Sequence, residues 1–256
     1  MRVFFGIPTG GAPTAPCLDS LRALALPAGT AAFERAVVTG NFVPAQRDAV
    51  VERALRWRAD VIVMCDDDMV LPPHALAALS EVLRDDASCA LAGALYYSRD
   101  GLRPMAVEGW DENDSTKGWI PAFGAAPVAV DGVGFGCVAI RAEAARQLSR
   151  PFFPAHVYVE LGEGRVRVCD EDYLFCARLR RSGHRVMLHP GVRCGHFDRA
   201  RGSIAPAAWE TPERTSVRRV LTRTGDRYQL TPLQDAPSAC VPERRLRADV
   251  QYIEVV

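Results

Sequence analysis

The chain has 256 residues, of which 48% are hydrophobic, and its 31 basic and 31 acidic residues give a formal net charge of zero. This length and apolar content suffice for one large domain with a full core, and they exclude disorder as the default interpretation. The balanced charge removes the electrostatic case for binding nucleic acid. Because no window reaches the roughly 18 apolar residues of a membrane span, and the N-terminal apolar run is too short for a signal peptide, we expect a soluble, cytoplasmic protein.

The first sixty residues alternate predicted strands and helices. Arg2 to Ile7 is a β-rich apolar run that stops at a Pro-Thr-Gly-Gly loop, and Ala32 to Val38 is a second candidate strand. Ala45 to Ala59 has apolar residues at helical spacing, and Val61 to Cys65 is a third apolar strand. This order predicts an α/β fold with a largely parallel sheet.

The middle of the chain continues the alternation. Pro72 and Pro73 can open a helix, because proline is tolerated in the first helical turn. Ser98 to Ala122 is polar and long enough to be a functional or mobile loop. The other predicted elements are a strand at Cys89 to Tyr97, a strand at Val128 to Val133, a turn at Gly134 to Gly136, a strand at Cys137 to Ile140 and a short helix at Ala142 to Leu148.

The last third begins with a strong helix signal. Asp170 to Ser182 has acidic residues at its start and arginines near its end, as the helix dipole favours, and Gly183 follows as a C-cap. Arg185 to His189 then predicts a strand, and Pro190 to His196 a loop. Residues 200–256 predict a C-terminal extension in which Val217 to Thr222 and Arg227 to Leu230 could pair as a hairpin.

Eight cysteines are spread along the chain, and several lie inside apolar segments, where free cysteine behaves as a small hydrophobic side chain. We therefore expect reduced thiols in the core. A zinc site is the weaker alternative, because no C-x2-C pair occurs. Its candidate ligands are Cys169, Cys176, Cys194 and His196.

Three adjacent carboxylates, Asp66, Asp67 and Asp68, follow the strand at Val61 to Cys65. Like charges brought together cost free energy unless a cation or hydrogen-bond donors face them. Ligands of open α/β sheets bind outside the carboxyl ends of strands, and carboxylate oxygens suit Mg2+ or Mn2+. The triplet predicts either a divalent-cation site or a solvated acidic turn that caps the next helix.

Two further polar clusters occur late in the chain, Asp170-Glu-Asp172 at a helix start and Cys194-Gly-His196 after a strand. Each has a structural explanation, the first as an acidic group that offsets the helix dipole and the second as an ordinary core or surface histidine. Their occurrence in one chain with the aspartate triplet favours a shared site.

These segments, taken in order, resemble the GT-A-fold glycosyltransferases, in particular the broad family 2-like group. The segments that carry the resemblance are Pro8-Thr9, Arg47, Asp66-Asp-Asp-Met69, Val130 to Cys137, Cys169 to Cys176 and Gly195-His-Phe197. The resemblance covers roughly residues 2 to 198. It implies a Rossmann-like, mixed and mostly parallel sheet flanked by helices, within a GT-A domain of residues 1–199 that is followed by the extension of residues 200–256.

The resemblance also implies a nucleotide site. Pro8 and Thr9 would line the pocket of a UDP- or GDP-sugar donor, and Arg47 would contact the base, ribose or diphosphate. Asp66 would contact the ribose or the metal shell. The sequence carries Asp48 where many relatives have asparagine after this arginine, which puts the role of Arg47 in doubt.

For the metal and the chemistry, the resemblance implies Asp68 and His196 as ligands of Mn2+ or Mg2+. Because three aspartates are consecutive, Asp67 could share this work and the metal-binding member is left open. Glu171 and Asp172 would supply the catalytic carboxylate. The residues that would approach the sugar or acceptor are Gly134, Phe135 and Gly136.

The implied chemistry is transfer of a sugar to an acceptor hydroxyl. A divalent ion would stabilise the departing nucleoside diphosphate, and Asp172 could take the acceptor proton in a single displacement that inverts the anomeric carbon. A retaining enzyme would share the metal site without needing this base, so both outcomes stay open.

The acceptor could be a carbohydrate, a lipid, a protein or a small molecule. Trp110 stands among acidic residues in the predicted loop, which predicts that it is exposed and serves as an acceptor or lid residue. Trp57 and Trp209 are assigned to packing.

Three other classes of protein compete with this interpretation. The triplet also fits the strand motif of haloacid-dehalogenase-like phosphatases, but it lies past residue 60 and Lys117, the only lysine, is in a polar loop. A sugar nucleotidyltransferase would need a glycine-rich loop followed by Arg and Lys, which the start of the chain lacks. A non-catalytic carbohydrate- or nucleotide-binding protein would not need Asp68, Asp172 and His196 together.

Overall fold

The computed structural model describes residues 1–110, 124–154 and 170–206, together with the backbone of short strands at 118–119, 157–160, 166–169, 219–224, 227–232 and 253–255. Its centre is a seven-stranded sheet in the order β2-β1-β3-β10-β5-β13-β8. The strands are β1 (Arg2–Thr9), β2 (Ala32–Thr39), β3 (Val61–Cys65), β5 (Cys89–Leu95), β8 (Val128–Val130), β10 (Cys137–Arg141) and β13 (Arg185–Arg193).

The sheet is mixed and mostly parallel. The parallel pairings of β1 with β2 and β3, and of β5 with β13, leave five strands running one way. β10 lies antiparallel between β3 and β5, and β8 is antiparallel to β13. The predicted fold class is therefore confirmed. Because β1 and β3 are neighbours and parallel, Thr9 and Asp66 leave the sheet at the same edge.

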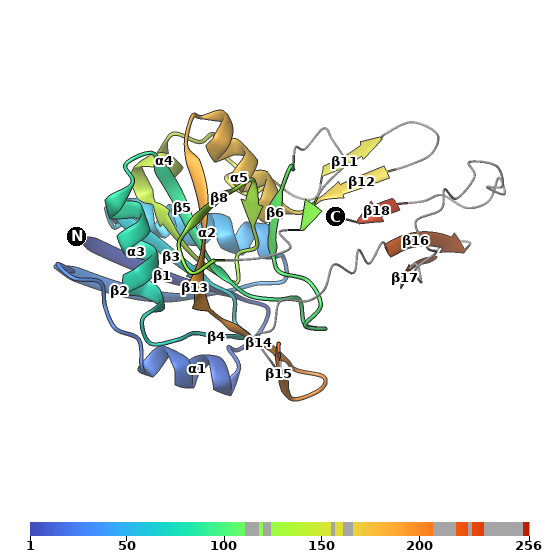
Figure 1. Cartoon of the computed structure of the whole chain (residues 1–256), viewed down its shortest axis with the longest axis horizontal. Coiled ribbons are helices and arrows are strands. Elements are labelled where there is room, and N and C mark those ends of the chain that lie inside the picture. Colours follow the sequence, from blue (N-terminus) through green and yellow to red (C-terminus); the bar gives the residue numbers. More distant parts are fainter. Residues whose placement is uncertain are drawn as a thin grey trace.

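Helices cover both faces of this sheet (Figure 1). Alternate residues of one strand enter different clusters, as the pleat requires: Phe4 packs on one face, and Val3 and Phe5 on the other. One face is covered by α2 (Val43–Arg56), α4 (Ala142–Arg146) and α5 (Glu171–Arg181), and the other by α1 (Ala15–Arg22) and α3 (Ala75–Asp85).

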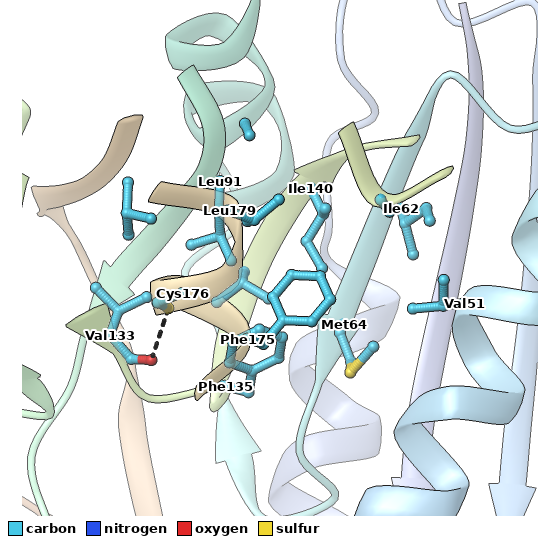
Figure 2. Packing of buried hydrophobic residues seen from close by; sticks show 14 of the residues in the cluster. Val51, Ile62, Met64, Leu91, Val133, Phe135, Ile140, Phe175, Cys176 and Leu179 are labelled. Atoms are coloured by element: carbon cyan, nitrogen blue, oxygen red, sulfur yellow. Dashed lines mark hydrogen bonds between the residues drawn. The ribbon is translucent and has the colours of Figure 1, made fainter. Parts of the chain in front are cut away.

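Aromatic rings from distant segments fill the first of these faces (Figure 2). Phe153 stacks on Phe175 at a centroid distance of 4.5 Å, and Phe135 meets Phe175 edge-on at 5.4 Å. The thiol of Cys176 contacts the carbonyl of Val133 at 3.7 Å. This packing fixes α5, and with it the two acidic residues at its start, against the sheet.

Smaller sheets accompany the central one. β4 (Met69–Val70), β14 (Gly195–Asp198) and β15 (Ser203–Ala205) form one of them, and β6 (Ala106–Glu108), β7 (Gly118–Trp119) and β9 (Gly132–Val133) another. A third contains β11 (Val157–Glu160), β12 (Val166–Cys169), β16 (Arg219–Thr224), β17 (Arg227–Pro232) and β18 (Ile253–Val255).

Most predicted elements are confirmed, with shifts of a few residues at their ends. Three predictions are wrong. The segment Ser98 to Ala122 is not a continuous loop, because it contains β6 and β7. The segment Val128 to Val133 is not one strand, because it breaks at Asp131, whose carboxylate binds Arg180 at 2.5 Å and the Trp110 amide at 3.0 Å. The segment Pro190 to His196 is not a loop, because β13 continues to Arg193 and β14 begins at Gly195.

Sequence reasoning also missed α1, a helix of eight residues whose N-cap Thr14 accepts a hydrogen bond from the Cys17 amide. It did anticipate the hairpin in the extension, since β16 and β17 pair in antiparallel fashion. β18 joins this hairpin to β12. The domain boundary at residue 199 stays a prediction.

The six cysteines whose side chains are described are free and buried, as predicted for core thiols. Trp57 packs on Phe4 with a ring distance of 6.1 Å, which agrees with its assignment to packing. Within the described part of the chain, no helix has both the length and the apolar character needed to cross a membrane.

Candidate active site

A cleft of about 660 Å³ opens at the carboxyl ends of β1 and β3, where the topology places the first loop and the aspartate triplet. Most of the residues that the sequence predicted for a site line this cleft. They are Pro8, Thr9, Arg47, Asp66, Asp67, Asp68, Asp172 and His196. Glu171, Gly134, Phe135, Gly136 and Trp110 do not line it.

The aspartate triplet forms a tight turn directly after β3. The Asp66 amide donates to the Gly136 carbonyl at 3.0 Å, and the Met69 amide donates back to the Asp66 carbonyl at 3.3 Å. The Thr14 amide holds the Asp67 carbonyl at 2.8 Å. Because the chain turns within three residues, the three carboxylates face different partners, which relieves the repulsion among them.

Asp66 belongs to a buried ion-pair group centred on Arg47. One terminal nitrogen of Arg47 lies 3.0 and 3.2 Å from the two Asp66 carboxylate oxygens, and the other lies 2.7 Å from Glu171 Oε1. Arg47 is 5% exposed, and its guanidinium lies 5.2 Å from the Phe135 ring. Burial raises the pKa of Asp66, although Arg47 opposes the shift. Arg47 therefore joins the β3 turn to the start of α5.

Asp67 is held on the other side of the turn. Its carboxylate accepts a hydrogen bond from the Thr9 hydroxyl and lies 3.0 Å from Arg199 Nη2. The same nitrogen donates to the Ala12 carbonyl at 3.0 Å. These contacts tie the triplet to the loop after β1, and they leave Asp67 engaged away from His196.

Asp68 is brought against His196 by strand pairing. β4 follows Asp68 immediately and pairs with β14, which places Met69 opposite His196. Asp68 Oδ2 lies 3.4 Å from His196 Nε2 and 2.6 Å from Arg99 Nη2. The other imidazole nitrogen, Nδ1, donates to the Tyr97 carbonyl at 2.9 Å, which fixes the ring so that Nε2 faces the carboxylate.

Asp68 and His196 each stabilise the charged form of the other side chain. Burial favours neutral Asp68, but the hydrogen bonds from His196 and Arg99 outweigh it and hold the pKa of Asp68 below its usual value. Burial likewise lowers the pKa of His196, but Asp68 reverses this effect and raises the pKa above its usual value.

Asp172 stands in the first turn of α5, on the cleft wall. It is 8% exposed, and its Oδ1 accepts a hydrogen bond from the Tyr173 amide at 2.8 Å. Burial raises the pKa of Asp172 well above its usual value, because the positive charge of Arg47 offsets only part of the desolvation. A carboxylate in this state is a stronger proton acceptor than one in water. Its neighbour Glu171 is occupied by Arg47, so the two acidic residues are not equivalent.

The turn at Gly134 to Gly136 packs on Tyr96. A side-chain carbon at Gly134 would lie 2.1 Å from the Tyr96 hydroxyl, and one at Gly136 would lie 2.7 Å from the Tyr96 ring. Phe135 is fully buried in the aromatic cluster. The predicted approach of this turn to a sugar therefore has no support in the structure, and Tyr96 is the group that requires the glycines.

We expect Gly134→Ala and Gly136→Ala each to destabilise the protein by about 1–3 kcal/mol through overpacking. Adding Tyr96→Phe should recover part of the loss in Gly134→Ala, because it removes the obstructing hydroxyl. It should recover nothing in Gly136→Ala, where the ring itself obstructs. Urea unfolding of the single and double variants measures both effects, and equal recovery at the two positions would contradict this assignment.

The prediction that Trp110 is exposed is wrong. It is 2% exposed, and its ring packs on Tyr173 at a centroid distance of 5.8 Å. The acidic residues that suggested exposure flank it in the sequence, but the indole packs inward against Tyr173 of α5. Asp111 and Trp119, which belong to the same polar segment as Trp110, lie outside the residues whose side chains are described, and so does Trp209, which was assigned to packing.

Sequence reasoning missed several residues that line the cleft. Arg99 contacts Asp68, Gln46 donates to the Thr9 carbonyl at 2.8 Å, and Tyr96 accepts from the Gly136 amide at 3.1 Å. Of these three residues, only Arg99 could have been found from the sequence, because it lies in the polar segment that was predicted to be functional. Gln46 and Tyr96 occupy positions that read as ordinary parts of a helix and a strand.

A sheet of this strand order, with the cleft at the strand ends, defines a GT-A-like fold. The solved structures that share it include two proteins of low sequence identity. The A197 protein from STIV matches with a TM-score of 0.59 and 17% identity, over 84% of this chain and 98% of that one. GalNAc-T7, solved with UDP, GalNAc and Mn2+, matches with a TM-score of 0.52 and 11% identity, over 76% of this chain and 43% of that one. No family model and no curated protein matches the sequence. At these identities the likeness concerns the fold alone.

Proposed function

We propose that the protein is a glycosyltransferase that moves a sugar from a nucleoside diphosphate donor to an acceptor hydroxyl and uses a divalent cation. The observation that carries the proposal is one cleft in which Asp68 Oδ2 and His196 Nε2 lie 3.4 Å apart and share the wall with Asp172. Support also comes from the GT-A-like fold, whose solved neighbour GalNAc-T7 was crystallised with UDP and Mn2+.

The donor set fits Mn2+ or Mg2+. Asp68 would supply a carboxylate oxygen and His196 an imidazole nitrogen, whose second ring nitrogen is already fixed by the Tyr97 carbonyl. Among the described residues, no group of three or more His, Cys, Asp or Glu side chains could hold a metal. Two protein ligands suit a cation that takes its remaining ligands from water and substrate phosphates.

The bound cation would stabilise the charge that develops on the departing diphosphate. Asp172 would take the proton of the acceptor hydroxyl as its oxygen attacks the anomeric carbon. The new carbon–oxygen bond forms while the bond to phosphate breaks, and the bonding electrons leave with the nucleoside diphosphate. This assignment favours inversion, and the anomeric configuration of the product distinguishes it from retention.

The donor site predicts a metal-dependent response to nucleotides. With Mn2+ present, UDP or GDP should raise the melting temperature, since saturation at 100 times Kd is worth about 2.7 kcal/mol. Asp68→Ala should abolish the part of the shift that requires Mn2+. Asp198→Asn, which removes another carboxylate from the same cleft, should keep it. If no nucleoside diphosphate shifts the protein with or without Mn2+, the donor proposal fails.

A further inference from the structure

Arg99 lies at the position where the proposed cation would meet Asp68. Its Nη2 is 2.6 Å from Asp68 Oδ2, the same oxygen that faces His196 Nε2 at 3.4 Å. The Arg99 side chain is 61% exposed and that of Asp68 only 4% exposed. The Arg99 guanidinium therefore extends inward from the rim of the cleft and covers the buried Asp68 carboxylate on its solvent side.

A compact turn presents Arg99 to the site. The Gly101 amide donates to the Ser98 carbonyl at 2.7 Å, and the Ser98 amide donates to the Arg103 carbonyl at 2.8 Å. Gly101 adopts a φ of 74°, which glycine accepts without strain. The main-chain bonds that close the turn come from residues other than Arg99. Its side chain can therefore leave Asp68 without unfolding the turn.

Two donors already face one oxygen of the buried Asp68 carboxylate. Arg99 Nη2 lies 2.6 Å and His196 Nε2 lies 3.4 Å from Asp68 Oδ2. A divalent cation on Asp68 Oδ2 would stand beside the guanidinium, and two positive charges at one buried oxygen repel each other. A cation on this oxygen would therefore be favoured when Arg99 has moved away.

We propose that Arg99 competes with the divalent cation for Asp68 Oδ2 and thereby weakens binding of the cation to the free protein. The proposal rests on the proposed function, which supplies the cation, but it concerns affinity and not turnover. It assigns to Arg99 a role in setting cation affinity that differs from the role of the ligands Asp68 and His196.

The test is the affinity of the full chain for Mn2+ alone, measured from the electron paramagnetic resonance signal of free Mn2+. Arg99→Gln should bind Mn2+ on the order of tenfold more tightly than the wild type, because a partly exposed charge pair no longer has to be broken. Arg201→Gln is the matched control. Arg201 is also an exposed arginine of the cleft, but its Nε lies 3.6 Å from Asp198, not against Asp68. Arg201→Gln should change the affinity for Mn2+ by no more than about twofold.

Each outcome decides the proposal. It is overturned if Arg99→Gln binds Mn2+ no more tightly than the wild type, if Arg201→Gln gains as much, or if none of the proteins binds Mn2+. Adding Asp68→Ala to Arg99→Gln should remove the gain, and a gain that survives this change overturns the proposal as well. Failure of the proposed function has a different signature, in which UDP and GDP do not shift the melting temperature while Arg99→Gln still binds Mn2+ more tightly.

Discussion

Asp172→Asn is expected to lose sugar transfer by a factor of about 10²–10⁴ in kcat, the usual contribution of a positioned general base. The asparagine oxygen can still accept the hydrogen bond from the Tyr173 amide, so the start of α5 should keep its geometry. The stabilisation by nucleotide and Mn2+ should also persist, because Asp68 and His196 are unchanged. Transfer is measured with the nucleotide sugar selected by the melting-temperature screen.

The same substitution should stabilise the protein at neutral pH. Burial raises the pKa of Asp172, so its contribution to stability is fully present below the unfolded pKa of about 3.9 and is lost as the pH rises through the folded pKa. The asparagine side chain cannot ionise, and the gain in melting temperature should therefore be larger at pH 8 than at pH 4. A variant that keeps near-full turnover would show that Asp172 is not the base.

Glu171→Gln is the matched control at the neighbouring carboxylate. Glu171 is bound to Arg47 and does not line the cleft, so its replacement should act on stability more than on the chemical step. A loss of turnover equal to that of Asp172→Asn, with an unchanged melting temperature, would reverse the assignment of the two residues.

The sequence predicted the fold well because continuous apolar segments mark its centre. Val61 to Cys65 is apolar at every position and becomes β3 with the predicted bounds. Asp170 to Ser182 has acidic residues at its start and arginines at its end, which both match the helix dipole. It becomes α5, with Asp170 as the N-cap and Ser182 as the C-cap. The short strands β4, β6 and β14 escaped prediction, because two to four residues carry too little periodicity and their pairing is set by tertiary contacts.

The candidate site was predicted as a set of residues, but not as a set of contacts. The pairing of β4 with β14, which brings His196 to Asp68, joins segments more than a hundred residues apart and leaves no local signal. Nor can sequence tell which carboxylate an arginine selects. Arg47 was assigned to the nucleotide through the resemblance, whereas its two terminal nitrogens bind Asp66 and Glu171. The same applies to Trp110, whose polar neighbours did not reveal the apolar contact with Tyr173.

Arg47→Met is expected to cause the largest loss of stability among these variants. Its guanidinium is the shared counter-charge of Asp66 and Glu171, and removing one partner of a buried ion pair costs about 3–5 kcal/mol because the remaining charge is left uncompensated. For a chain of this length we expect a fall in melting temperature on the order of 10 °C. The deficit should shrink as the pH falls toward 4, because burial raises the pKa of Asp66 and this carboxylate then takes up a proton.

Two further variants separate charge from shape at this position. Arg47→Lys keeps the charge but cannot bind two carboxylates with one planar fork, so it should recover only part of the stability. Glu171→Gln added to Arg47→Met should also recover part, since it removes one of the two uncompensated charges. If Arg47→Met melts within about 1 °C of the wild type, the ion-pair group does not hold the β3 turn to α5. Asp66 would then be available to a ligand, and the nucleotide contact that the resemblance implies for Arg47 would become the better explanation of this residue.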